Sequence, residues 1–190
     1  MSWLFSDLTK EFGFISGLGF SSAPLKDYSK MGWAGNLGFY NILFLSDKIG
    51  FRTEYLLSTR GYRKDMLAYY QDLYGGTFTG EGFTKFRYTS IDFPIMMNVD
   101  INKNIRLYGG TSIGYDIIAR YKEDYSIQSA GGSDFIGTDK GTNTSDVAFS
   151  VRSILGAEYV VNDKMRVGAR CISPIGLQMR TLNLTFAYNF

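Results

Sequence analysis

Apolar and polar residues alternate along most of this chain, and most regularly in its last ten residues. From Thr181 to Phe190, leucine and aromatic residues at the even positions alternate with small or polar residues at the odd ones. A period of two indicates a β-strand, because successive side chains of a strand point to opposite faces. One face of this strand is therefore wholly apolar, and either another part of the chain or lipid must cover it.

The same alternation predicts seven further strands. The predicted strands lie near residues 11–20, 31–44, 49–60, 84–100, 105–119, 146–160, 165–173 and 181–190. Short turns at 45–48, 102–104 and 162–164 alternate with longer connections at 21–30, 61–83, 120–145 and 174–180. Membrane barrels of the up-and-down type have short periplasmic turns and long outer loops. We therefore predict an all-β fold: an eight-stranded antiparallel up-and-down transmembrane β-barrel over 11–190, preceded by a periplasmic segment at 1–10.

The two faces of the predicted strands differ in charge and size. One face is apolar, and the other combines small residues with mid-strand charges at Arg52, Glu54, Asp92, Arg106, Asp116, Arg152, Glu158, Arg166 and Arg170. Small residues belong inside a narrow barrel, where eight strands leave room only for side chains. A charge facing lipid costs about 2–4 kcal/mol at the midplane, whereas opposite charges in the lumen can pair. We expect these nine residues to form a lumen charge network.

Aromatic residues near the predicted strand ends fit interfacial girdles or local packing. They are Trp33, Tyr40, Phe44, Tyr62, Tyr88, Tyr121 and Tyr159.

Composition restricts the chemistry. The 190 residues include no histidine and one cysteine, Cys171, which removes imidazole bases, the commonest zinc ligand and an intrachain disulfide. Paired carboxylates such as Glu54 and Asp92 could in principle act in acid–base catalysis, but salt bridges with arginines are the simpler interpretation. We expect no enzyme activity, no metal and no cofactor. The net charge of +2, without a basic block, gives no indication of nucleic-acid binding.

The first ten residues lack a basic region followed by a long apolar stretch, so they are not a signal peptide. We expect the protein in the outer membrane of a Gram-negative bacterium. That destination requires a leader, so we expect the chain to be a mature or recombinant form without it.

Residues 90–97, Ser-Ile-Asp-Phe-Pro-Ile-Met-Met, carry a family resemblance. The segment resembles the strand motif Tyr-Leu-Glu-Ile-Pro-Leu of the PorT-like outer-membrane β-barrel family of Bacteroidetes. Asp92 and Pro94 fall where that family has its acid and proline, and Ser90 departs from its tyrosine. The whole pattern also resembles the general OmpA/OmpX eight-stranded architecture.

The final strand resembles the carboxy-terminal signal by which the outer-membrane assembly machinery recognises its clients. The resemblance implies that Leu184, Phe186, Tyr188 and Phe190 are recognition positions.

The connection at 61–83 is the candidate partner-binding loop. Arg63, Tyr69, Tyr70 and Tyr74 give it the aromatic and arginine content of binding hot spots. The alternative is a strand pair that continues beyond the membrane, with tyrosines that pack locally.

Three functions remain open at this point. The first is a non-enzymatic barrel with a filled, charged lumen that acts as a structural or accessory subunit of a larger envelope or secretion complex. Its partners would be lipid, the assembly machinery and other outer-membrane or secretion proteins. The second is a narrow porin-like channel for small solutes. The third is a soluble ligand-binding barrel of the lipocalin type.

Overall fold

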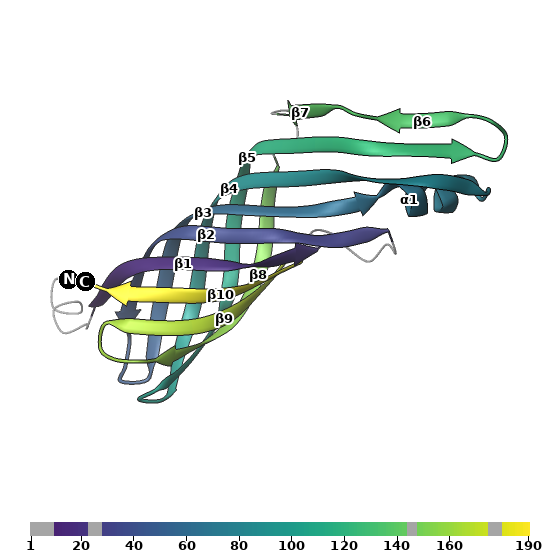
Figure 1. Ribbon diagram of the computed structural model, residues 1–190. Coiled ribbons are helices and arrows are strands. Elements are labelled where there is room, and N and C mark those ends of the chain that lie inside the picture. Colours follow the sequence, from purple (N-terminus) through teal and green to yellow (C-terminus); the bar gives the residue numbers. More distant parts are fainter. Residues whose placement is uncertain (1–9, 23–27, 144–147, 175–179) are drawn as a thin grey trace.

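Ten strands and one helix make up the part of the chain that the structure describes (Figure 1). The structure is a computed structural model, and it describes residues 10–22, 28–143, 148–174 and 180–190. The elements are β1 (Lys10–Ser22), β2 (Ser29–Phe44), β3 (Ile49–Asp65), α1 (Met66–Tyr74), β4 (Phe78–Asn102), β5 (Ile105–Ser129), β6 (Asp134–Gly137), β7 (Lys140–Asn143), β8 (Phe149–Val160), β9 (Met165–Pro174) and β10 (Arg180–Asn189). Apart from Lys10, the segment predicted to be periplasmic lies outside the described residues.

Eight of these strands form a closed antiparallel ring. The order runs β4-β3-β2-β1-β10-β9-β8-β5, and β4 pairs with β5 to close it. The first and last strands meet in register, with Gly17 opposite Thr185. The eight-stranded up-and-down prediction is therefore confirmed. A closed ring leaves no unpaired strand edge, so every backbone group in it can be satisfied without water.

Side chains cap the short turns at one end of the ring. The Asn102 Oδ1 accepts hydrogen bonds from the backbone N–H groups of Asn104 and Ile105 at 2.8 and 3.0 Å. Asn162 repeats this arrangement in the turn between β8 and β9. Asparagine favours such turns because its side chain can bond to backbone two or three residues ahead.

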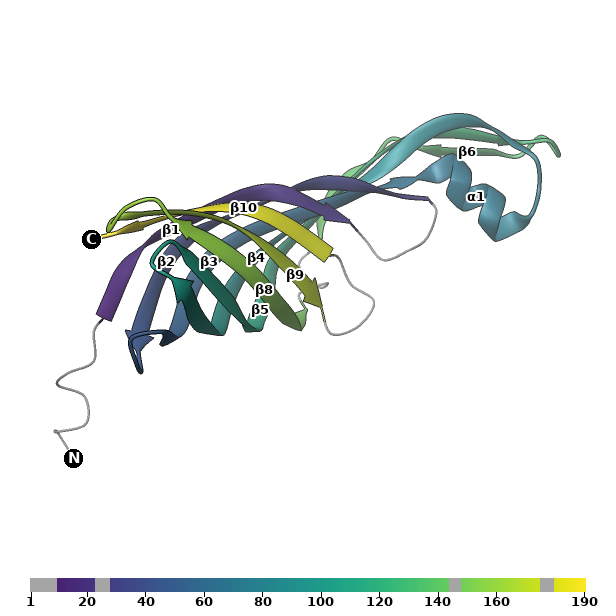
Figure 2. The ribbon, with the colours of Figure 1, turned by 90° about the horizontal axis from the view of Figure 1, so that it is seen from below.

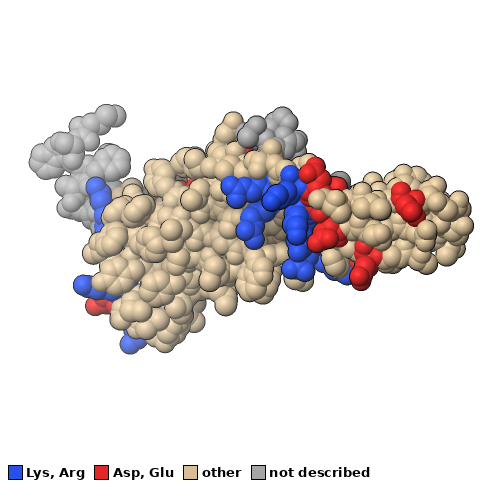
Figure 3. Space-filling view, turned by 45° about the horizontal axis from the view of Figure 1, so that its top comes forward, with Lys and Arg blue, Asp and Glu red and all other residues tan. Residues whose placement is uncertain are grey.

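The ring carries an apolar surface and a charged interior. Leu155 and Leu184 point outward with 71% and 72% of their surface exposed, whereas Arg52 and Arg170 are buried inside at 0% and 1%. Figure 3 shows the resulting outer wall, largely free of charge, with a band of lysine and arginine where the wall ends. A water-soluble barrel has the opposite arrangement, so this wall requires an apolar solvent.

Three strands continue well past the ring. β4 and β5 are 25 residues long each, and β3 extends to Asp65. We call residues 61–88 and 119–143 the extension; Figures 1 and 2 show it projecting from one end of the barrel, with α1 lying against its sheet. The predicted strand ends at 60, 84 and 119 were wrong because the apolar outer face stops there while backbone pairing continues.

A β-bulge separates the ring from the extension in β5. Ser90 pairs with Asp116, but the next residue of β4, Thr89, pairs with Ile118, so Ile117 is an extra residue. An extra residue reverses which face the following side chains take. Tyr115 faces outward before the bulge, and Arg120 faces outward after it.

Within the described residues, no helix has the length and apolar character needed to cross a membrane.

Replacing Ile113 by arginine tests whether the outer wall contacts hydrocarbon. Ile113 lies on the outer face between Phe93 and Val151 of the neighbouring strands. We expect Ile113→Arg to lower the free energy of unfolding by about 2–4 kcal/mol in lipid bilayers, measured by urea titration. The matched control is Ile136→Arg in the extension, where the side chain is also exposed and the charge meets water. Equal effects of both substitutions would contradict a lipid-facing wall.

Candidate functional site: the lumen and the extension

Among the described residues, six arginines and six carboxylates lie in the lumen in three clusters. The turn-side cluster contains Glu11, Asp100, Arg106 and Arg166; the middle cluster contains Arg52, Glu54, Glu158 and Arg170; and the extension-side cluster contains Arg60, Asp92, Asp116 and Arg152. Each cluster has two arginines and two carboxylates, so each is neutral by itself. Buried charges are tolerated when they are paired in this way.

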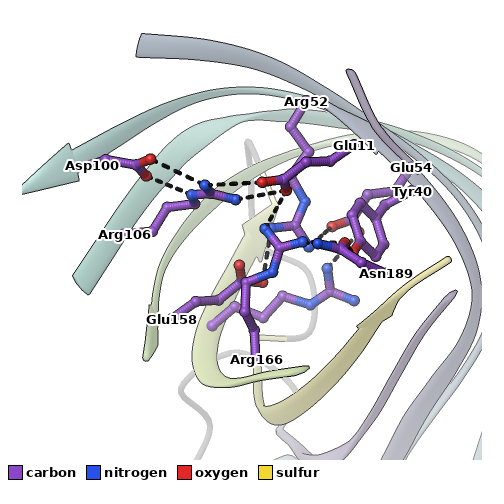
Figure 4. A network of polar contacts seen from close by, with 10 residues as sticks. Glu11, Tyr40, Arg52, Glu54, Asp100, Arg106, Glu158, Arg166 and Asn189 are labelled. Carbon is purple, nitrogen blue, oxygen red and sulfur yellow. Dashed lines mark hydrogen bonds and ion pairs between the residues drawn. The ribbon is translucent and has the colours of Figure 1, made fainter. Parts of the chain in front are cut away.

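The turn-side cluster is built around Arg106 and Glu11. Asp100 binds Arg106 through both carboxylate oxygens, at 2.5 Å to Nε and 3.0 Å to Nη2 (Figure 4). Glu11 bridges the two arginines of the cluster, at 3.1 Å from Arg106 and 2.6 Å from Arg166. The Arg166 guanidinium also donates to the Tyr40 hydroxyl at 2.7 Å. Two-oxygen pairing with a guanidinium fixes geometry as well as charge.

Arg52 is the centre of the middle cluster. Its guanidinium lies 2.7 Å from Glu54 and 2.7 Å from Glu158, and Arg170 reaches Glu54 at 2.6 Å. The Tyr40 and Tyr108 rings lie 5.1 and 4.9 Å from the Arg52 guanidinium carbon. Aromatic faces attract a guanidinium at these distances. The arginine is therefore held by two carboxylates and two rings and has no exposed surface.

The extension-side cluster consists of two linked ion pairs at the end of the lumen nearest the extension. Arg152 binds Asp92 at 2.9 Å, and Arg60 binds Asp116 at 2.5 Å. Arg152 also lies 3.6 Å from Asp116, which links the two pairs.

All nine lumen residues named from the sequence are buried, none more than 6% exposed. Sequence reasoning missed Arg60, Glu11 and Asp100. All three have the inward parity of their strands, but each lies at the end of a predicted strand, where only interior charges were considered. The five arginines and four carboxylates expected from the sequence thus become six and six.

The lumen carboxylates have little room for acid–base chemistry. The nearest arginine nitrogen lies between 2.5 and 2.9 Å from each of the six. Each carboxylate therefore has at least one oxygen atom held by an arginine, which leaves less of it available to a substrate. Among the described residues, no three of His, Cys, Asp and Glu are grouped to hold a metal ion.

Tyr40 packs locally in the lumen and takes no part in an interfacial girdle, which is the second of the two roles that the sequence left open. Tyr40 is fully buried in the lumen, opposite Gly13 of β1. A Cβ at position 13 would collide with the Tyr40 ring, so the glycine makes the space that the ring fills. Trp33 and Tyr159 do face outward, with 64% and 50% exposed.

The structure brings together the three tyrosines of the candidate partner-binding loop, with Tyr70 between Tyr69 and Tyr74 at ring-centroid distances of 5.6 and 5.7 Å, but not Arg63. Tyr70 packs on Phe135 with ring centroids 4.6 Å apart and is half-buried in the core of the extension. Tyr69 contacts the Lys64 ammonium at 3.0 Å, while Tyr74 is 58% exposed. Arg63 lies on the opposite, outer face of the sheet. All three tyrosines therefore make local ring contacts, which is the alternative that the sequence left open.

Capping residues fix the ends of α1. The Asp65 carboxylate accepts a hydrogen bond from the Ala68 N–H, and Gly75 ends the helix in the left-handed conformation with φ of 62°. Burial raises the pKa of the Asp65 carboxyl, but hydrogen bonds from the Lys30 ammonium and the Ala68 N–H outweigh burial and hold that pKa below its usual range. The carboxylate is therefore ionised at neutral pH, as an N-cap at the positive end of a helix should be.

Comparison with solved structures shows which fold this is. The crystal structure of Ail, the attachment invasion locus protein of Yersinia pestis, aligns over 95% of this chain and 98% of its own, with 15% identity and a TM-score of 0.50. The fold is that of a transmembrane β-barrel. Ail in complex with the heparin analogue sucrose octasulfate aligns over 95% of this chain and 99% of its own, with 16% identity and a TM-score of 0.51.

The likeness to Ail extends to the fold and no further, because the identity is low. No protein-family model matches the chain, and no curated protein matches it in sequence.

Removing one member of the middle cluster tests the importance of charge balance. We expect Arg52→Met to lower the free energy of unfolding by about 3–5 kcal/mol, because Glu158 loses its arginine while it stays buried. The double variant Arg52→Met/Glu158→Met leaves the Glu54–Arg170 pair neutral, so it should be more stable than the single variant. Urea unfolding in detergent micelles measures both. A double variant that is less stable than the single one would contradict this account.

Proposed function

We propose that the protein is a non-enzymatic outer-membrane β-barrel of a Gram-negative bacterium that is closed to solutes and supports an extension outside the membrane. The observation that carries this proposal is the lumen filled by three neutral clusters, with Arg52 and Arg170 almost without exposed surface. A channel needs a continuous water path, and these side chains occupy that path at three levels. The paired carboxylates argue in the same way against catalysis.

The outer-membrane location is supported by the apolar wall and by the likeness to Ail, which is an outer membrane protein. The outward side chains of β10 also fit a client of the assembly machinery. Leu184, Phe186 and Phe190 are exposed on the outer surface, and Tyr188 is half-buried beside them. Their role as a recognition signal stays a prediction, as does the periplasmic position of residues 1–10.

An accessory role in a larger envelope or secretion complex is the finer part of the proposal. The extension supports it, because a packed aromatic core holds α1 and β6 in one arrangement, with Leu73, Tyr74 and Ile136 exposed at 53%, 58% and 66%. Contiguous exposed apolar residues are typical of partner sites, and Leu73 and Tyr74 are neighbours in the last turn of α1. The resemblance of residues 90–97 to the PorT-like family stays a hypothesis in the same direction.

The lipocalin-type and the porin-like alternatives each require a lumen that differs from the one observed. A lipocalin-type barrel needs an apolar cavity for its ligand, whereas this lumen is lined by charges. A porin-like channel requires the three charge clusters to separate so that water can pass through the lumen.

Single-channel recording in planar bilayers tests whether the lumen is closed. We expect no current steps from the wild-type protein, because the three clusters block the water path. The control for insertion is heat-dependent gel mobility of the same sample. Current steps that change in size with Arg52→Gln, but not with Lys48→Gln in a turn, would support the channel alternative and overturn closure.

Substitution of the exposed apolar residues tests the accessory role. We expect Leu73→Ser/Ile136→Ser to abolish stable co-purification of a specific outer-membrane protein in mild detergent, since the double variant removes two exposed apolar side chains and leaves the aromatic rings of the extension core in place. The matched control is Leu155→Ser/Leu184→Ser on the barrel wall. A protein that purifies alone from native membranes would contradict an accessory role.

A further inference from the structure

Two rows of basic side chains cross the outer face of the sheet just beyond the apolar wall. Arg63, Lys85, Lys122 and Lys140 lie directly opposite one another on β3, β4, β5 and β7. Two residues nearer the barrel, Arg87 lies opposite Arg120. Directly opposed residues share a face of the sheet, so all six side chains point the same way, and all six are exposed.

These rows are unfavourable unless an anion binds to them. Like charges directly opposite each other on neighbouring strands destabilise a sheet. Within the described part of the chain, Lys122 pairs with Asp124 at 3.5 Å with both side chains largely exposed, and the other five form no ion pair. Among the described residues, this part of the outer face therefore holds an excess of positive charge.

A groove of about 840 Å³ runs along these rows. All six basic residues line it, and no acidic residue of the described segments does. Phe20 and Trp33, with ring centroids 4.9 Å apart, line it as well and are 48% and 64% exposed. The groove thus combines cations with exposed aromatic surface, which suits a ligand that has an anionic part and an apolar part.

The position of the rows identifies the kind of ligand. On the barrel side, the outer face continues into the apolar wall through Leu57, Ile91 and Tyr115. On the far side, Asp65 and Asp124 lie in the next outer row, and Figure 3 shows red beyond the blue band. The rows therefore lie where hydrocarbon gives way to lipid headgroups.

We propose that this groove binds the phosphate groups of an anionic lipid in the leaflet around the barrel, an inference that rests on the proposed membrane location. Arginine forks bind phosphate through two hydrogen bonds, and lysines supply further charge. The two rows are about 6.6 Å apart along the strands, which favours a headgroup with two phosphates. Phe20 and Trp33 then lie beside the start of its acyl chains.

Lipid binding by two matched variants tests the proposal. The full chain is inserted into zwitterionic nanodiscs that contain a glycolipid with two phosphate monoesters or its dephosphorylated form, and bound lipid is titrated by native mass spectrometry. The belt variant is Lys85→Gln/Lys122→Gln/Lys140→Gln. The control is Lys48→Gln/Lys103→Gln/Lys164→Gln, which removes the same charge from exposed turns at the other end of the barrel.

We expect the belt variant to bind the phosphorylated glycolipid about 100-fold more weakly than wild type, since each basic residue at a membrane surface contributes about fivefold. The control variant should bind like wild type, and the dephosphorylated lipid should not bind specifically. Equal binding by the two variants, or of the two lipids, overturns the proposal. Tight binding of soluble inositol hexakisphosphate without retention of the glycolipid overturns the lipid as its source. A chain that inserts but fails these tests leaves the proposed function intact, whereas a chain that does not enter the nanodisc overturns both.

Discussion

Ion pairing between arginines and carboxylates inside a closed ring is the interaction on which the rest of this structure depends. The outer wall must be apolar, so the charges carried by alternate positions have only the lumen to occupy. A buried guanidinium such as Arg52 is tolerated there because Glu54 and Glu158 both lie 2.7 Å from it. The pairs also join strands that are distant in sequence: Arg52 on β3 binds Glu158 on β8, and Glu11 on β1 binds Arg106 on β5. Charge balance and ring closure therefore support each other.

The glycines and tyrosines of the inner wall complete this arrangement. Tyr40 lies over Gly13, and Tyr108 lies over Gly156, each across one strand pair. The two rings lie near the Arg52 guanidinium from different strands. Small residues are needed beside large ones, because eight strands enclose little space. The glycines of the inner wall therefore make room for the two rings that lie beside Arg52.

The alternation of Ile91, Phe93 and Ile95 with Asp92 and Pro94 shows how much of the barrel could be predicted from sequence. Parity alone identified the strands of the ring and nine of the twelve lumen charges. It missed Arg60 at the end of its strand, since nothing in a local pattern says that pairing continues once the outer face turns polar. The bulge at Ile117 was also invisible, because an extra residue is defined by the partner strand. The helix α1 had local signals in Asp65 and Gly75, but nine residues give too weak a periodicity beside so many tyrosines. The separation of Arg63 from those tyrosines depends on which face α1 covers, and sequence spacing does not specify that.

The bulge at Ile117 separates the side-chain pattern of the extension from that of the ring. Deleting that one residue would exchange the outward and inward side chains of β5 throughout the extension, while the pairing of Ile105 to Asp116 within the ring would be untouched. An insertion or deletion of one residue at this point would change which side chains of the extension face outward and would leave the ion pairs of the lumen in place. Insertions and deletions should therefore be tolerated best after Ile117 on β5 and before Thr89 on β4, which is the part of each strand that lies in the extension.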